Sequence, residues 1–289
     1  MKTQNTNPSI INCLRPTWLL DTAFAYILGT VIARYLGFQL DWIRFLLGGA
    51  WVFSLQLSGH CLDHYFAQQD PSSPINPNQK FSIWASSAAL STTAVITIYF
   101  MMADLISSST LMLMLLLIGG MLVTTVPPLR LSESVYRELT LSTLVVVLVP
   151  AMAYILQANQ LHRFVPMSVF PLAILHTAAL IMLKFPNFAT DKKYEKPSLL
   201  VSFGWQRGML IINTLTLSAF LLLGLALLAG LSPRIVLPVF LVFPLALFQI
   251  WYLNRIASGA KPHWKALSWS GFSIYGLTAY LLLFGFLTN

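Results

Sequence analysis

Two short polar stretches, each at the end of a long apolar run, hold most of the residues that could do chemistry. The first stretch, residues 63–70, begins and ends on aspartate, and the second, residues 187–196, carries Asn187, Asp191 and Glu195 at a spacing of four. That spacing places the three side chains on one face if the helix continues that far. A carboxylate at the end of a membrane helix is costly unless it is solvated, paired or bound to a metal, so these clusters indicate a site. Solvated loop ends are the alternative explanation.

The composition shows what kind of helices must position these residues. Hydrophobic residues make up 57% of the 289-residue chain and charged residues 9%, with a mean hydropathy of +0.73. A soluble domain is about a quarter charged, so the chain is predicted to be an all-α, polytopic membrane bundle forming one domain over residues 1–289. We expect nine transmembrane helices around a central cavity, at about 18–37, 43–62, 82–104, 110–127, 139–157, 165–184, 208–230, 235–252 and 269–287.

The positive charges set the expected orientation. With nine spans, 13 of the 17 Lys and Arg residues fall on the side of the N-terminus, and the four exceptions are Arg34, Arg44, Arg163 and Arg234. Positive residues accumulate on the cytoplasmic side of membranes, so the N-terminus is predicted to be cytoplasmic and the C-terminus external. Membrane topology then accounts for the net charge of +8, and no nucleic-acid partner is needed to explain it.

This topology brings acids and bases to the same side of the membrane. Both polar stretches face the cytoplasm, and so does Arg130 in the loop after the fourth span. Gln56 and His60, followed by Asp63 or His64, form a further polar stripe at the cytoplasmic end of the second span. Mg²⁺ binds a few carboxylates together with substrate phosphates, and basic side chains offset the remaining phosphate charge. The pattern therefore favours a site for a metal–diphosphate complex.

Four segments of the chain resemble the UbiA-type membrane prenyltransferases, in the same order. They are Leu14-Arg15-Pro16 before the first span, Leu55 to Ala67 at the first aspartate-rich motif, Pro127-Pro128-Leu129-Arg130 followed by Glu138, and Phe185 to Asp191 followed by Lys196 at the second motif. Each segment is weak evidence on its own. Together, in a chain with nine predicted spans, they form a fairly specific resemblance.

The two motifs depart from the family pattern. His64 and Ala67 stand where the family has the two aspartates of its first motif, and Asn187 replaces the first aspartate of the second motif. An amide oxygen brings no charge to Mg²⁺, and imidazole suits transition metals better than this hard cation. The ligands that the resemblance leaves for Mg²⁺ are Asp63, Asp70, Asn187 and Asp191.

The resemblance implies transfer of an isoprenyl group from a prenyl diphosphate to an aromatic or lipid acceptor. It implies Mg²⁺ as the cofactor and makes Asp63 and Asp191 the catalytic carboxylates. The residues expected to contact the diphosphate are Arg130, Lys196 and Lys192, and those expected to line the acceptor pocket are Gln56, His60 and His64.

Other functions remain open at this stage. A catalytically silent homologue that binds an isoprenoid or a partner would explain the missing carboxylates, and a membrane terpene cyclase or a transporter would use the same helices. Two polar residues inside the predicted spans each have two possible roles. His176 could line the cavity or make a hydrogen bond between helices, and Asp21 could face the pocket or pair with Arg15.

Overall fold

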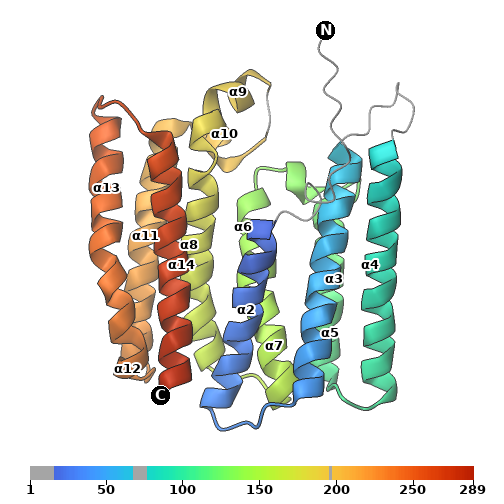
Figure 1. Ribbon diagram of the computed structural model, residues 1–289. Coiled ribbons are helices and arrows are strands. Elements are labelled where there is room, and N and C mark those ends of the chain that lie inside the picture. Colours follow the sequence, from blue (N-terminus) through green and yellow to red (C-terminus); the bar gives the residue numbers. More distant parts are fainter. Residues whose placement is uncertain (1–15, 68–76, 195–196) are drawn as a thin grey trace.

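The structure, a computed structural model, is a bundle of long helices that run up and down beside one another (Figure 1). It describes residues 16–67, 77–194 and 197–289. The long helices are α2 (Pro16–Tyr35), α3 (Trp42–Ala67), α4 (Pro77–Met102), α5 (Ser108–Thr125), α8 (Phe164–Met182), α11 (Trp205–Leu228) and α14 (Trp264–Thr288). Two further spans are interrupted helices, composed of α6 (Arg137–Ser142), η2 (Thr143–Leu148) and α7 (Val149–Ala158), and of α12 (Pro233–Val236), η4 (Leu237–Val242) and α13 (Phe243–Ala257).

The predicted fold class, a polytopic bundle of membrane helices, is confirmed. Within the described residues, eight helices are long and apolar enough to cross a membrane. Helix α2 is 20 residues long and lies in the same bundle, although it is not one of those eight (Figure 1). The expected count of nine spans therefore depends on α2, which contains two charged residues, Asp21 and Arg34.

Apolar residues cover the helices on all sides, as expected of helices that face lipid as well as one another. Trp51, Met152 and Leu223 are completely buried between helices, whereas Leu228 and Leu241 are about four-fifths exposed on the outside, at 81% and 77%. In water such exposure would be costly, but against lipid chains it is favourable. The bundle is thus built for a bilayer.

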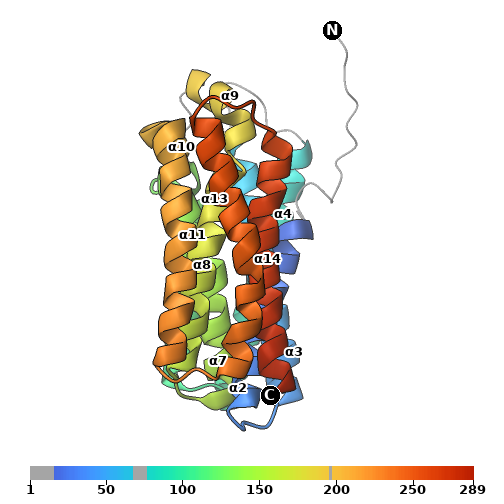
Figure 2. The ribbon, with the colours of Figure 1, turned by 90° about the vertical axis from the view of Figure 1, so that its left-hand side faces the viewer.

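Helix α8 lies in the interior of the bundle and packs against α2, α6, α11 and α14. Figure 2 views the bundle from the left-hand side of Figure 1, and in this view α13 and α14 lie in front of α8. Because α8 also contacts η2 and α7, it connects the N-terminal half of the bundle, α2 to α7, with the C-terminal half, α11 to α14. A polar residue on α8 can therefore reach partners from both halves.

The fifth span is irregular where it passes α8. Residues Thr143–Leu148 form a π-helix, and Pro150 follows directly in α7. Proline has no N–H and breaks the regular hydrogen-bonding ladder, and π-helical turns often occur at functional sites. This irregular turn brings Leu144 and Val145 to the wall of a pocket described below.

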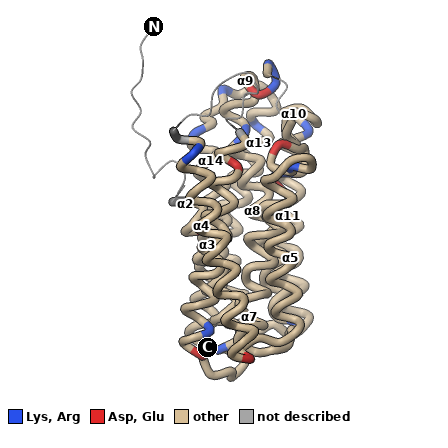
Figure 3. Tube along the Cα trace, turned by 90° about the vertical axis from the view of Figure 1, so that its right-hand side faces the viewer, with Lys and Arg blue, Asp and Glu red and all other residues tan. Residues whose placement is uncertain are grey.

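The two ends of the bundle differ. Short helices, η3 (Phe185–Asn187), α9 (Phe188–Lys193) and α10 (Leu199–Phe203), lie at one end, and the C-terminus lies at the other (Figure 1). Charged residues gather at both ends and are sparse between them, with more at the end that carries α9 and α10 (Figure 3). This distribution agrees with a membrane protein, while the cytoplasmic position of that end stays a prediction.

Candidate active site: two pockets that share Trp18

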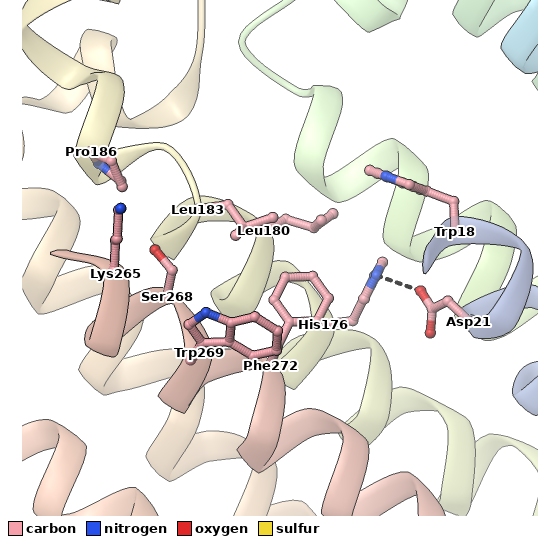
Figure 4. Close-up of a pocket in the computed structure, with 10 residues that line it drawn as sticks. All are labelled: Trp18, Asp21, His176, Leu180, Leu183, Pro186, Lys265, Ser268, Trp269 and Phe272. Atoms are coloured by element: carbon pink, nitrogen blue, oxygen red, sulfur yellow. Dashed lines mark ion pairs between the residues drawn. The ribbon is translucent and has the colours of Figure 1, made fainter. Parts of the chain in front are cut away.

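An apolar cavity of about 400 Å³ lies between α2, α8 and α14. Its walls are mostly aromatic and aliphatic side chains, including Trp18, Leu180, Trp269 and Phe272 (Figure 4). Because α8 and α14 are packed together along their length, these side chains are held by rigid elements rather than by loops. A cavity of this kind suits an isoprenoid chain or an aromatic ring.

A cluster of polar side chains interrupts the wall of this apolar cavity. The carboxylate of Asp21 on α2 accepts a hydrogen bond from the Tyr275 hydroxyl on α14. Its other oxygen lies 2.9 Å from Nε2 of His176 on α8 (Figure 4). His176 Nδ1 lies 2.9 Å from the Ser142 hydroxyl, and that hydroxyl donates to the Glu138 carbonyl oxygen at 2.9 Å. Helices from both halves of the bundle thus meet in one hydrogen-bonded cluster.

This cluster answers two questions that the sequence left open. His176 is 1% exposed and makes contacts between helices, while it also lies against the cavity. Asp21 faces the cavity and pairs with His176 and Tyr275, whereas Arg15 lies outside the described residues. An intramembrane carboxylate with two partners is far less costly than an isolated one.

A second pocket, of about 40 Å³, shares Trp18 with the first, and we call it the polar pocket because several polar side chains lie among the apolar ones in its wall. Its polar lining comes from α3, the end of α5 and the segment that leads into α6, and includes Gln56, His60, Asp63 and Arg137. Nη2 of Arg137 lies 4.0 Å from Oδ2 of Asp63, and Nε2 of Gln56 lies 3.3 Å from Nε2 of His60. The Trp18 ring meets the His60 ring edge-on with their centres 5.9 Å apart, so Trp18 lines both pockets.

Several buried polar atoms near this end of the bundle have no hydrogen-bond partner among the described residues. They are Nε and Nη2 of Arg130 and Oγ of Ser132. Arg130 has a left-handed backbone conformation with φ of 33°, and its Nη1 pairs with Glu133 at 2.8 Å. Buried donors without partners are costly, so the remaining N–H groups of Arg130 suit an anionic ligand.

Glu138 is the most deeply buried carboxylate in this region, with 2% exposure. Arg137 precedes it directly on α6. A carboxylate buried in this way is costly unless hydrogen-bond donors or charges lie around it. Glu138 therefore depends on the groups that surround it at this end of the bundle.

Two of the predicted acceptor-pocket residues, Gln56 and His60, and the predicted metal ligand Asp63 come together in the polar pocket. His64 instead hydrogen-bonds through Nδ1 to Ser82 on α4 at 3.0 Å, so it connects α3 to α4. Asp70 and Lys196 lie outside the described residues, which leaves their predicted roles as predictions.

The second predicted stretch lies at the end of the bundle, apart from both pockets. Asn187 is exposed at the end of η3, and Asp191 and Lys192 are on α9, half-buried and exposed respectively. Neither of the two pockets has any of these three residues in its wall. Pro186, which does line the apolar cavity, is the nearest point at which this stretch meets it.

The described residues do not make up a Mg²⁺ site by themselves. No group of three or more His, Cys, Asp or Glu side chains with metal-binding geometry occurs among them. Asp63 is the carboxylate that lines the polar pocket, and it already faces Arg137. Mg²⁺ prefers several oxygen ligands in octahedral geometry, which this donor set lacks.

Sequence reasoning missed Trp18, Arg137 and Tyr275 as parts of the site. Arg137 had a local signal, because it starts a span beside Glu138 and seven residues after Arg130. Tyr275 had none, since it lies 254 residues from its partner Asp21 within an apolar helix. Only the packing of α2 against α14 brings the two together.

Comparison with known proteins supports the fold. No protein-family model matches the sequence, and a search of curated protein sequences finds no match. Solved structures do match. A UbiA homolog from Archaeoglobus fulgidus bound to GPP and Mg²⁺ is 14% identical with a TM-score of 0.62, over 96% of this chain and 99% of that one. The same homolog bound to DMAPP and Mg²⁺ is 14% identical with a TM-score of 0.61, over 94% and 98%.

A digeranylgeranylglyceryl phosphate synthase is a further structural neighbour, with 14% identity and a TM-score of 0.64 over 98% of this chain and 96% of that one. These matches extend over nearly the full length of both chains, so the whole bundle is shared and not only a few helices. At 14% identity the likeness establishes architecture rather than activity. The chain therefore has the fold of the UbiA-type membrane prenyltransferases.

Proposed function

We propose that this protein is an integral membrane prenyltransferase that binds a prenyl diphosphate and transfers its isoprenyl group to an aromatic or lipid acceptor. The observation that carries the proposal is the pair of pockets that share Trp18. One pocket has mainly aromatic and aliphatic walls, and the other has Gln56, His60, Asp63 and Arg137 among its lining residues. An apolar cavity next to a pocket with an arginine in its wall matches a ligand with an apolar chain and an anionic head.

The chemistry that these residues can perform is stabilisation of a leaving group. When the bond between the prenyl carbon and the diphosphate oxygen breaks, the electron pair leaves with the diphosphate and an allylic cation remains. Arg137 in the polar pocket and the unpartnered N–H groups of Arg130 are the candidate donors to that diphosphate. Fixed donors of this kind lower the barrier most when the site excludes water.

Aromatic faces serve the other product of that bond cleavage. Trp18, Trp269 and Phe272 line the apolar cavity, and the electron-rich face of an aromatic ring attracts a cation. An allylic cation formed next to Trp18 is therefore held in a cavity whose aromatic walls stabilise it. The acceptor, which enters the same cavity, captures the cation.

We propose Mg²⁺ as the cofactor because structural neighbours bind it, and not because the described residues form a metal site. The A. fulgidus homolog was solved with Mg²⁺ and prenyl diphosphates. Mg²⁺ that is held mainly by substrate phosphates needs only one or two protein carboxylates. The two motifs supply Asp63 and Asp191 as candidates for these carboxylates. Asn187 and Asp70 are candidates for further ligands. Lys192 and Lys196 remain candidates for contacts to the diphosphate.

A silent homologue that binds an isoprenoid without transferring it is the second candidate function. The observation that favours it is the incomplete set of metal ligands among the described residues. Such a protein would keep the apolar cavity and the arginines, and would bind prenyl diphosphates without releasing diphosphate.

The experiment that separates the two functions uses the purified full-length protein in nanodiscs. Prenyl diphosphates of 10, 15 and 20 carbons would be added with and without Mg²⁺, together with a total lipid extract, and both diphosphate release and prenylated products would be measured. Metal-dependent release with a new prenylated product supports transfer. Binding without release supports the silent homologue, and the absence of binding contradicts both proposals.

The proposed orientation has its own test. The N-terminus is proposed to be cytoplasmic and the C-terminus external, because the positive charges favour that arrangement. A reporter that is active only outside the cytoplasm, fused after Asn289, is expected to be active. Activity of a cytoplasmic reporter at the same position would contradict this topology.

A further inference from the structure

The wall of the apolar cavity contains a carboxylate whose role goes beyond holding helices together. Asp21 lines the cavity, and its side chain is 11% exposed. Of the described residues that line this cavity, Lys265 is the only Lys or Arg, and it lies ten residues before Tyr275 on α14. Ten helical residues span about 15 Å, so Lys265 lies well away from the level of the Asp21–Tyr275 contact along the helix.

Asp21 has room to accept a further hydrogen bond. An ionised carboxylate offers about four lone-pair positions. Tyr275 donates to one oxygen and His176 lies against the other, so two positions remain. These two partners fix the orientation of the carboxylate, and the cavity reaches it from the open side.

His176 and Tyr275 position Asp21 and are not themselves available to a ligand. His176 is 1% exposed, and both of its ring nitrogens are engaged, one by Asp21 and one by Ser142. Tyr275 is 5% exposed and its hydroxyl donates to Asp21. The carboxylate is thus the member of the cluster that can meet a ligand in the cavity.

The place of Asp21 relative to the polar pocket is also informative. Trp18 and Asp21 are three residues apart on α2, so they lie on the same face of the helix, and both line the cavity. Trp18 also lines the polar pocket that contains Arg137. A prenyl diphosphate with its head beside Arg137 would therefore extend past Trp18 towards Asp21.

We propose that Asp21 binds the hydroxyl group of a phenol or alcohol acceptor and takes its proton during transfer. This inference rests on the prenyl transfer proposed above. The bond between the prenyl carbon and the diphosphate breaks, and its electron pair leaves with the diphosphate. A lone pair of the acceptor oxygen forms the new carbon–oxygen bond, and the acceptor proton passes to the Asp21 carboxylate.

The first test measures binding alone, so it does not depend on catalysis. The probes are 4-propylphenol and its methyl ether, which differ by the hydroxyl proton, with the full-length protein in detergent. A hydrogen bond to a charged group is strong, so the wild type is expected to bind the phenol about tenfold or more tightly than the ether. Asp21→Asn, which keeps the size and removes the charge, should reduce that preference to about threefold or less.

Gly276→Ala is the matched control, because it lies next to Tyr275 on α14, nothing lies within 4 Å of its added Cβ, and it leaves Asp21 and both of its partners in place. It should keep the preference for the phenol. Equal binding of the phenol and the ether by the wild type would overturn the inference, and so would a full preference in Asp21→Asn.

The second test measures transfer from a 20-carbon prenyl diphosphate to 4-propylphenol. A general base contributes about 10²–10⁴-fold, so Asp21→Asn should lower kcat for aryl ether formation by at least about 10²-fold. The Kd for the prenyl diphosphate should stay within about threefold, which also shows that the variant is folded. Aryl ether formation at the wild-type rate in Asp21→Asn would overturn the role of Asp21 and leave the prenyltransferase proposal intact. A hydroxyl preference that depends on Asp21, without transfer by the wild type to 4-propylphenol or to any acceptor in the lipid extract, would support the binding site and overturn the prenyltransferase proposal.

Discussion

The apolar cavity and the polar pocket differ in how their polar groups are satisfied, although they share Trp18. In the cavity wall, Asp21 accepts a hydrogen bond from Tyr275 and pairs with His176. Around the polar pocket, buried atoms of Ser132 and of the nearby Arg130 have no partner among the described residues. Packing of long helices is sufficient to complete the first site.

The second site depends on connecting segments. Ser132 and Arg130 lie between α5 and α6, and the predicted ligands Asp70 and Lys196 fall in the parts of the chain that the structure does not describe. A site formed by rigid helices is positioned more accurately than one formed by loops. The two pockets should therefore respond differently to substitution.

The largest effect is expected from Asp191→Ala. Asp191 is the second-motif carboxylate that matches the family pattern, and loss of a metal ligand removes stabilisation of the leaving group. Turnover should fall by about 10³-fold or more, which corresponds to at least ~4 kcal/mol in the barrier. The measurement is diphosphate release as a function of Mg²⁺ concentration.

Glu195→Ala is the control for Asp191→Ala, because Glu195 lies four residues further along the same stretch and should matter much less. Asp191 lies on α9 and lines neither pocket, so this experiment also tests whether the second motif contributes to the site at all. Full activity of Asp191→Ala would show that the motif resemblance does not extend to function.

The next effect concerns the polar pocket. Arg137→Ala should lower kcat/KM for the prenyl diphosphate by about 10²–10³-fold, because a fixed donor to the leaving group is lost. Arg137→Lys should recover part of the loss, since it restores the charge but not the fork of N–H donors. If Arg137→Ala had wild-type kinetics, the diphosphate would not bind in this pocket.

A smaller effect is expected where the two pockets meet. Trp18→Ala should lower the transfer rate by about tenfold, because it removes an aromatic face next to the reacting carbon and admits water. Trp18→Phe keeps an aromatic face and should lose less. The informative measurement is the ratio of free prenyl alcohol, the product of water capture, to prenylated acceptor. An unchanged ratio in Trp18→Ala would mean that Trp18 does not separate the pockets.

The same contrast explains which features the sequence predicted. Apolar runs of about 20 residues define membrane helices through composition alone, so the bundle and the approximate limits of its spans followed from the sequence. The polar stripe of Gln56, His60 and Asp63 was also predictable, because helical spacing fixes which side chains share a face. These are local properties.

Properties that depend on contacts between distant helices were not predictable. Asp21 contacts Tyr275 and His176 only because α2, α8 and α14 pack together, and no local sequence pattern indicates these partners. His64 had the same helical spacing as its neighbours, yet its ring turns to Ser82 on α4. A side chain at the edge of a polar stripe on a helix can contact either of two neighbouring helices. The packing of the bundle determines which of them it contacts.

The smallest effect tests the rigid side of the comparison, where α2 packs against α7. A Cβ atom added at Gly29 would lie 2.1 Å from the backbone carbonyl oxygen of Pro150, which cannot move as a side chain can. Gly29→Ala should therefore destabilise the bundle by about 1–3 kcal/mol and shift α2, which carries Trp18 and Asp21. Gly276→Ala on α14 is the control, because nothing lies within 4 Å of its added Cβ and alanine favours helix. Thermal unfolding in detergent measures the stability, and the phenol preference of the cavity measures the shift of α2. If Gly29→Ala matched Gly276→Ala in both measurements, the contact between α2 and α7 would not be what holds the cavity wall in place.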